Sequence, residues 1–258
     1  MCRTRDDRVV TGGRSEVDPA RRGELAAAVT RVRERIAAAC AAASRDPAGV
    51  RLLAVTKTYP ATDVALLADL GVPDVAEARD QEAVPKVAEV TALVPEAVCW
   101  HMVGRLQRNK TRSVARWARQ VQSVDSVRLV DALDRAARAA QDVGERDGAV
   151  GVLVQASVDG DPVRGGCPLP KLEALADRVA AAAGLRLEGV MGVAPLDVAA
   201  ELAFAELAAA AQRLRRAHPG AVELSAGMSG DFEQAIAQGS TCVRVGTALL
   251  GDRPLTSR

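Results

Sequence analysis

The sequence has few aromatic side chains and almost no net charge. Its 258 residues include two Phe, two Trp and one Tyr, and 34 basic residues balance 33 acidic ones to a formal charge of +1. So small a charge gives no long-range field to hold nucleic acid or an anionic membrane. The few aromatic rings also leave little on which bases could stack. We therefore expect neither nucleic acid nor a membrane as a partner.

Cysteine pairs and long apolar runs are absent as well. The five cysteines, at positions 2, 40, 99, 167 and 242, are odd in number and contain no Cys-x-x-Cys pair, which argues against a disulfide framework and against a zinc site. The sequence contains no run of 18 apolar residues, so no membrane span is predicted. The N-terminus lacks the apolar segment of a secretory signal. We expect a cytoplasmic protein that binds no metal.

Lysine is scarce among the basic residues, of which only Lys57, Lys86, Lys110 and Lys171 are lysine. An arginine supplies positive charge equally well, so a lysine at a special position suggests amine chemistry. The last three lie in predicted helices or at their starts, where exposed surface positions explain them. Lys57 differs because it closes a predicted apolar strand.

The pattern of apolar residues predicts an α/β fold. A helix is expected over 18–44, with Asp18 as its N-cap and Pro19 at its first helical position. Helical segments then alternate with eight predicted strands, at 51–57, 73–77, 98–103, 120–124, 150–157, 186–193, 222–226 and 241–246. Strands that alternate with helices pair in parallel, and eight of them indicate a single (β/α)8 TIM barrel with an extra N-terminal helix.

A doubly wound open sheet is the alternative, although no G-x-G-x-x-G follows the first strand, as a dinucleotide-binding version would require. No linker divides the chain, so we expect one domain over 18–258, after a disordered tail over 1–17. We also expect no second domain after the eighth strand.

The carboxyl ends of the strands are where a parallel barrel carries its functional residues. Lys57 follows the first strand, and desolvation lowers the pKa of a partly buried lysine, which leaves free amine for a Schiff base. An ion pair with Glu77 is the alternative. The turns at Ser225–Asp231 and at Gly246-Thr247 follow the last two strands, where barrels frequently bind phosphate. Arg244 shares a face with Cys242, so it points inward toward a ligand or an interior ion pair.

The segment from Trp100 to Lys110 is densely polar for one that follows a strand. His101 is either an acid–base group or, more often for a lone strand histidine, a core residue. Arg105, Arg108, Lys110 and Arg112 form a basic patch, which fits a solvated loop or a small anionic ligand.

Five segments together resemble the pyridoxal phosphate homeostasis protein family over about residues 20–252. They are Ala54–Thr58, Trp100–Lys110, Gly192–Pro195, Leu224–Phe232 and Val243–Thr247. The resemblance implies a barrel like the N-terminal domain of alanine racemase. It also implies that pyridoxal 5′-phosphate (PLP) is bound as an internal aldimine on Lys57. By the same resemblance Ser229, Gly246 and Thr247 hold the phosphate, Arg244 approaches the pyridine nitrogen, and Met228 lies beside it.

The resemblance implies a non-catalytic, monomeric PLP-binding protein that buffers the cofactor or delivers it to PLP-dependent apoenzymes, and so affects amino-acid and 2-oxo-acid balance. An arginine at the pyridine nitrogen keeps that nitrogen unprotonated, which makes the ring a poor electron sink. Three alternatives stay open: a weak PLP-dependent racemase, a Schiff-base aldolase or lyase that uses Lys57, and a regulatory module that binds a partner through 101–110.

One departure from the family pattern lies after the second strand. The family has Phe-Gly-Glu-Asn where this chain has Val75-Ala76-Glu77-Ala78, so the Asn side chain near the cofactor is missing. We expect the change at Ala78 to affect the PLP affinity or the orientation of the ring more than it affects the fold.

Overall fold

The computed structural model describes residues 18–95, 98–161, 164–195 and 197–251. The tail expected over 1–17 and the last seven residues of the expected domain lie outside the described residues.

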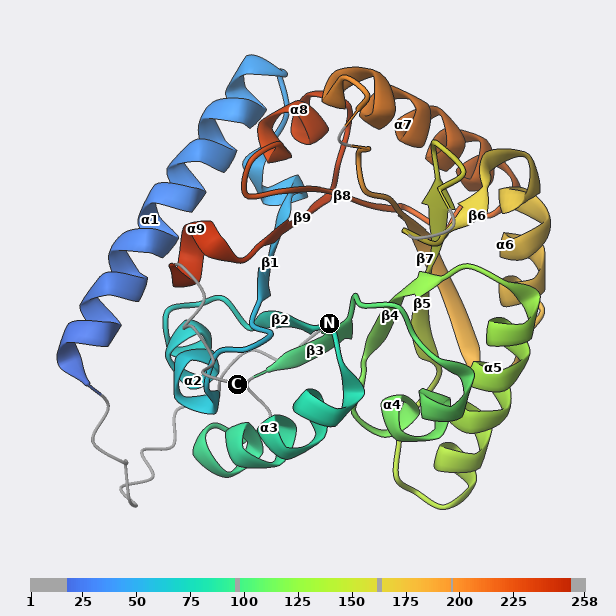
Figure 1. The fold of residues 1–258 in the computed structure, drawn as a ribbon, viewed down its shortest axis with the longest axis horizontal. Helices are drawn as coiled ribbons and strands as arrows, with labels where there is room; N and C mark the ends of the chain where they lie inside the picture. The colour runs from blue at the N-terminus through green and yellow to red at the C-terminus, as the bar shows by residue number, and fades with distance from the viewer. Residues whose placement is uncertain (1–17, 96–97, 162–163, 196, 252–258) are drawn as a thin grey trace.

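Eight parallel strands form a closed barrel (Figure 1). In the order of the chain they are β1 (Arg51–Val55), β2 (Asp74–Glu77), β3 (Cys99–Met102), β4 (Gln120–Val124), β5 (Val150–Ser157), β7 (Leu185–Met191), β8 (Glu223–Met228) and β9 (Cys242–Val245). Pairing of β4 with β5 closes the ring. This confirms the predicted barrel and all eight predicted strands. The two-residue strand β6 (Cys167–Pro168), which pairs with β5, was not predicted.

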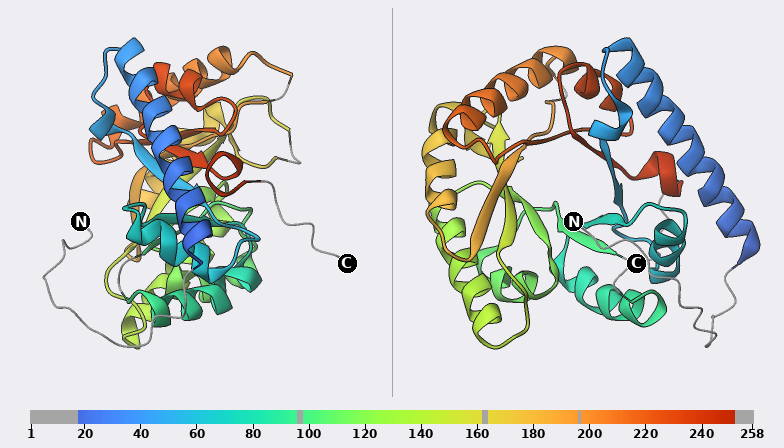
Figure 2. Two further views of the ribbon diagram at one scale, coloured as in Figure 1. Left: turned by 90° about the vertical axis from the view of Figure 1, so that its left-hand side faces the viewer. Right: turned by 180° about the vertical axis from the view of Figure 1, so that it is seen from behind.

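The helices lie outside the ring of strands (Figure 2). They are α1 (Pro19–Ala42), α2 (Ala61–Asp69), α3 (Asp80–Leu93), α4 (Thr111–Trp117), α5 (Val127–Asp142), α6 (Leu172–Ala180), α7 (Ala200–Ala217), α8 (Phe232–Ala237) and α9 (Thr247–Leu250). Short 3-10 turns occupy η1 (Pro47–Gly49), η2 (Arg108–Lys110) and η3 (Leu169–Lys171). Only α9 has no counterpart among the predicted helices, because four residues are too few for a periodic pattern.

Helix α1 lies across the outside of the barrel against α8 and α9. Its first turn is capped as predicted, since the Asp18 side chain accepts a hydrogen bond from Ala20 N at 2.9 Å. Its apolar stripe is buried, and the Arg35 guanidinium lies 4.3 Å from the ring centroid of Phe232 in α8. This packing fixes α8, which directly follows the turn after β8.

Apolar side chains fill the space between strands and helices in two large clusters. Inside the barrel, by contrast, the apolar cluster consists of Leu53, Ala76 and Cys242. The rest of the interior toward the amino ends of the strands is polar. There His101 is fully buried, and its ring nitrogens lie 2.9 Å from Asp74 Oδ1 and 3.0 Å from Gln120 Oε1.

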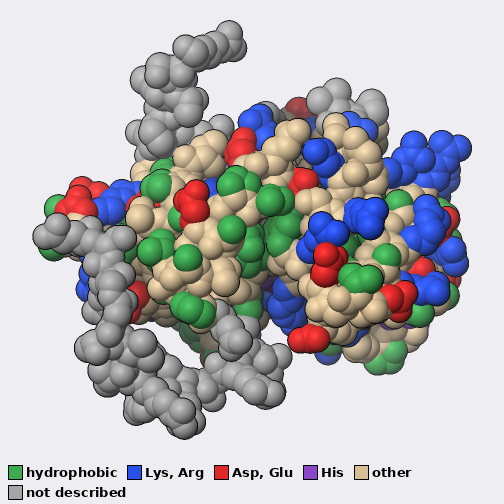
Figure 3. Space-filling model, turned by 90° about the horizontal axis from the view of Figure 1, so that it is seen from below, with side chains coloured by type: hydrophobic (Ala, Val, Ile, Leu, Met, Phe, Trp, Pro, Cys, Tyr) green, Lys and Arg blue, Asp and Glu red, His purple; other side chains and the backbone are tan. Residues whose placement is uncertain are grey.

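The surface carries an uneven distribution of charge despite the balanced composition. On the face seen in Figure 3, hydrophobic side chains lie toward one end and Lys and Arg side chains gather toward the other. Within the described part of the chain, no helix has the length and apolar character needed to cross a membrane.

The close approach of the loop after β3 to the end of β2 gives a prediction for Gly104. A Cβ atom at this position would lie 2.0 Å from the carbonyl oxygen of Ala78, which is backbone and cannot swing aside. We expect Gly104→Ala to lower the free energy of unfolding by about 1–3 kcal/mol, measured by urea denaturation. Gly23→Ala is the control, because Gly23 has open space on helix α1 and should gain stability. Equal effects of the two changes would contradict this prediction.

Candidate functional site

Lys57 lies in a tight turn directly after β1 and is partly exposed. The turn is closed by a hydrogen bond from Tyr59 N to Thr56 O at 3.1 Å. Within it Thr58 has a φ of 71°, in the left-handed region that β-branched residues rarely adopt. Such a conformation costs about 1–3 kcal/mol and persists only where neighbouring contacts enforce it.

Three side-chain contacts hold this turn in place. Lys86 Nζ donates to the carbonyl oxygen of Thr56 at 2.9 Å, and Thr56 Oγ1 donates to Glu77 Oε1 at 2.8 Å. On the other side, the Tyr59 hydroxyl donates to Gly251 O at 2.6 Å. Thr56 and Tyr59 are therefore fixed on the two sides of the turn, and the Lys57 side chain between them is partly exposed.

Lys86 is not the exposed surface charge that we expected from the sequence. It is buried, and its Nζ lies 2.7 Å from Glu77 Oε1. It lies on the same buried stripe of α3 as Ala83 and Val90, at spacings of three and four residues. That spacing was the sequence signal for its burial.

Glu77 is fully buried, and burial raises the pKa of its carboxyl group against the opposing effect of Lys86. Its second oxygen, Oε2, has no hydrogen-bond partner. A buried carboxylate that is only half satisfied depends strongly on the ammonium beside it.

The two turns predicted to hold a phosphate lie on neighbouring strands. Ser229 follows β8, Gly246 and Thr247 follow β9, and Ser229 Oγ accepts a long hydrogen bond of 3.4 Å from Ala248 N. Met228, at the end of β8, is 41% exposed. Hydroxyl groups and backbone N–H groups are thus brought together at the barrel edge, which is a donor set that suits a phosphate.

Gly227 shapes the first of these turns. Its φ is 89°, and a Cβ atom there would lie 2.7 Å from Phe232 Cα and from Ala235 Cβ. The turn is then closed by a hydrogen bond of 2.6 Å from Met228 N to Asp231 Oδ1. Only glycine satisfies both the positive φ and the close approach of α8.

Arg244 points into the barrel, as strand alternation predicted, and is 5% exposed. Its guanidinium donates to Ser225 O at 2.8 Å, to Ser225 Oγ at 2.9 Å and to Gly192 O at 2.9 Å. These acceptors are neutral, and no described carboxylate forms an ion pair with it. Burial accordingly lowers the pKa of Arg244. The alternative of an interior ion pair is wrong within the described residues.

A chain of amide and hydroxyl groups connects Arg244 to the polar interior. Ser225 Oγ donates to Gln122 Oε1 at 2.8 Å, and Gln122 Nε2 donates to Gln120 Oε1 at 2.8 Å. Gln120 in turn bonds to His101. The core interpretation of His101 is therefore confirmed. The alternation Gln120-Val121-Gln122 was the signal for this network, and our reading of the sequence missed it.

The order of the strands places all the predicted site residues on one arc of the barrel. Strand β9 lies between β1 and β8, so the turn with Lys57 adjoins the turn with Gly246, which adjoins the turn with Ser229. Arg244 lies below them within β9. The Lys57 amine, the hydroxyl and N–H groups of two turns and the buried Arg244 guanidinium thus lie at three consecutive strands.

The two departures after β2 have different surroundings. Ala76 is fully buried with Leu53 and Cys242, where its methyl group contributes to the interior apolar cluster. Ala78 instead lines a small cavity of about 220 Å³ beside Met102 and Arg105. A larger polar side chain would have room at position 78.

Comparisons with known proteins identify relatives along most of the chain. The family described as alanine racemase, N-terminal domain, matches residues 29–254. A protein of Mycobacterium tuberculosis named pyridoxal phosphate homeostasis protein is 49% identical over 250 residues, covering 93% of this chain and 96% of that relative. The protein of the same name from Escherichia coli is 33% identical over 238 residues, covering 91% and 99%.

The chain is also similar to a solved structure. The structure of PipY from Synechococcus elongatus with PLP bound superposes with a TM-score of 0.74 at 31% identity, over 88% of this chain and all of that one.

The buried pair beneath the turn with Lys57 gives a second prediction. We expect Lys86→Met to lower the free energy of unfolding by about 3 kcal/mol, because it leaves the Glu77 carboxylate buried without a partner. The double variant Glu77→Gln/Lys86→Met should recover part of that loss. Urea denaturation of the PLP-free proteins measures both.

The exposed Lys171 supplies the control, since Lys171→Met should change stability by less than about 0.5 kcal/mol. An effect of Lys86→Met as small as that of the control would show that the pair contributes nothing.

Proposed function

Because the chain belongs to the pyridoxal phosphate homeostasis protein family, within the wider family of the alanine racemase N-terminal domain, we propose that it binds PLP in the cytoplasm. It buffers the cofactor and delivers it to PLP-dependent apoenzymes, acting as a monomer and without turning over a substrate. The PLP-bound structure of PipY, at 31% identity, supports the cofactor.

The observation that carries this proposal is the buried positive charge of Arg244. The side chain is 5% exposed and makes hydrogen bonds only to neutral acceptors. A buried charge without a counter-charge is costly, so a ligand that offers electron-rich acceptors would stabilise it. Three N–H groups are already used, which leaves two of the five on a guanidinium for such a ligand.

The donor set fits PLP group by group. Ser229, Gly246 and Thr247 would hold the phosphate, Arg244 would face the pyridine nitrogen, and Met228 would lie beside it. The Lys57 amine would attack the aldehyde carbon, so that a C=N bond forms and one water molecule leaves, and PLP is held as an internal aldimine. The rigid turn around Lys57 limits where that amine can reach.

The surroundings of the only tyrosine support a non-catalytic role. Racemisation needs an acid–base group on the far side of the cofactor, and Tyr59 is instead buried with its hydroxyl donated to Gly251 O. An arginine at the pyridine nitrogen would also disfavour protonation of the ring, which weakens carbanion chemistry. Chiral analysis of amino acids after incubation with the PLP-loaded protein tests this, since time-dependent racemisation would overturn it.

The covalent attachment gives a third prediction. Mixing the protein with PLP should produce a visible absorption band, and borohydride should then fix a pyridoxyl group on Lys57, located by peptide mapping with mass spectrometry. Lys57→Ala should abolish both signals, because the other amine at that turn, Lys86 Nζ, is buried and paired with Glu77, and it should leave the PLP-free fold intact.

The matched control is Lys171→Ala, which should keep the band and the borohydride product. The proposal fails if the wild-type protein gives no band or if the pyridoxyl group is found on another lysine. A large loss of thermal stability in PLP-free Lys57→Ala relative to PLP-free wild type would contradict the expected separation of binding from folding.

The departure at position 78 gives a fourth prediction. We expect Ala78→Asn to tighten PLP binding by roughly fivefold, the value of about one hydrogen bond of 1 kcal/mol, because the cavity there has room for an amide near the cofactor. A fluorescence titration with PLP measures the dissociation constant. An unchanged or weaker constant would count against a role of this position in binding.

A further inference from the structure

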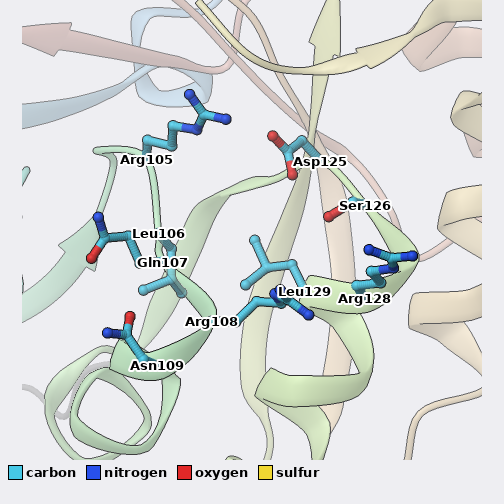
Figure 4. A pocket seen from close by; sticks show the side chains of 9 residues that line it. All are labelled: Arg105, Leu106, Gln107, Arg108, Asn109, Asp125, Ser126, Arg128 and Leu129. Atoms are coloured by element: carbon cyan, nitrogen blue, oxygen red, sulfur yellow. The ribbon is translucent and has the colours of Figure 1, made fainter.

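A groove that the proposed PLP site does not use lies beside the barrel mouth. Its volume is about 800 Å³, and it runs between the loop after β3 and the start of α5 (Figure 4). Arg105 and Arg108 reach it from the loop, and Arg128 from the first turn of α5. Leu106 and Leu129 lie among them and are almost fully buried.

The three arginines of this groove are exposed and carry unneutralised charge. Arginines elsewhere are commonly paired, as Arg21 is with Asp63 and Arg178 with Asp131. The guanidinium groups of Arg105, Arg108 and Arg128, by contrast, make no hydrogen bond or ion pair with any side chain that the structure describes. Three adjacent cations without counter-charges repel one another, so the groove favours a polyanionic partner.

Asp125, the one carboxylate that lines the groove, forms no ion pair with these arginines in the part of the chain that the structure describes. Its Oδ2 lies 3.4 Å from the position that a Cβ atom on Gly165 would take, so it also approaches the loop after β5. Helix α5, which is 16 residues long, begins in the groove, and its N-cap Ser126 makes no side-chain capping bond. The positive end of the helix dipole therefore adds to the field of the arginines.

The shape of the groove favours a polypeptide over a small anion. The guanidinium groups are exposed and come from separate elements, as Figure 4 shows for Arg105 and Arg128. A small anion would therefore contact only one of them and would keep most of its hydration shell. A chain with several carboxylates reaches all three at once.

We propose that this groove is a docking surface for an acidic segment of a partner protein. Residues 105–109 and 125–129 follow β3 and β4 at the same edge of the barrel as Lys57, so a partner docked there faces the barrel mouth. Naming that partner as the recipient of PLP rests on the proposed function. Charge complementarity of this kind speeds association and weakens as salt increases.

The test uses a fluorescein-labelled twelve-residue peptide of alternating Glu and Leu as the probe, followed by fluorescence anisotropy. The groove variant is Arg105→Glu/Arg108→Glu/Arg128→Glu. The control is Arg31→Glu/Arg215→Glu/Arg216→Glu, which makes the same change of charge at exposed arginines on α1 and α7. We expect the groove variant to bind at least tenfold more weakly than wild type, and the control variant to bind like wild type.

Equal binding of the peptide to all three proteins would overturn the proposal. So would displacement of the peptide by inorganic phosphate beyond that caused by chloride at equal ionic strength, because this would identify a site for small anions. The PLP absorption band is recorded in the same samples. Absence of the band in wild type refutes the proposed function, whereas absence of peptide binding to wild type with the band present refutes only the groove.

Discussion

The buried charge of Arg244 is the constraint on which the interpretation of this barrel depends. Closure of the eight strands places the guanidinium inside, 5% exposed, with only carbonyl and hydroxyl oxygens as partners. The hydrogen bonds through Ser225 and Gln122 fix its position without neutralising it. The phosphate-binding turns proposed above it and the amine of Lys57 lie on the adjacent strands, so one ligand can engage all three.

The turn that carries Lys57 shows how the fold keeps a reactive side chain in a set position. Thr58 adopts a positive φ of 71°, a conformation that the chain would leave if it were free to relax. The buried pair of Lys86 and Glu77 holds one side of the turn and Tyr59 the other. The stability of this pair and the geometry of the proposed attachment site are therefore coupled.

Periodicity and turn composition predicted much of this structure. The eight strands and the cap of α1 followed from local patterns, and strand alternation placed Arg244 inside the barrel. Local patterns do not reveal which distant side chains meet. Glu77 and Lys86 pair across a strand and a helix, and the role of Lys86 emerges only when the buried stripe of α3 is known. The four residues of α9 are too few for a periodic signal. The alternation of Gln120 and Gln122 was a local signal for a polar interior, but their hydrogen-bond partners are determined by the closed barrel.

A crystal structure of the protein soaked with PLP tests the central claim most directly. We expect continuous density from Lys57 Nζ to the cofactor, with the Arg244 guanidinium as the group nearest the pyridine nitrogen and the phosphate between Ser229 and Thr247. Cofactor bound elsewhere, or a carboxylate at the ring nitrogen in place of Arg244, would contradict it.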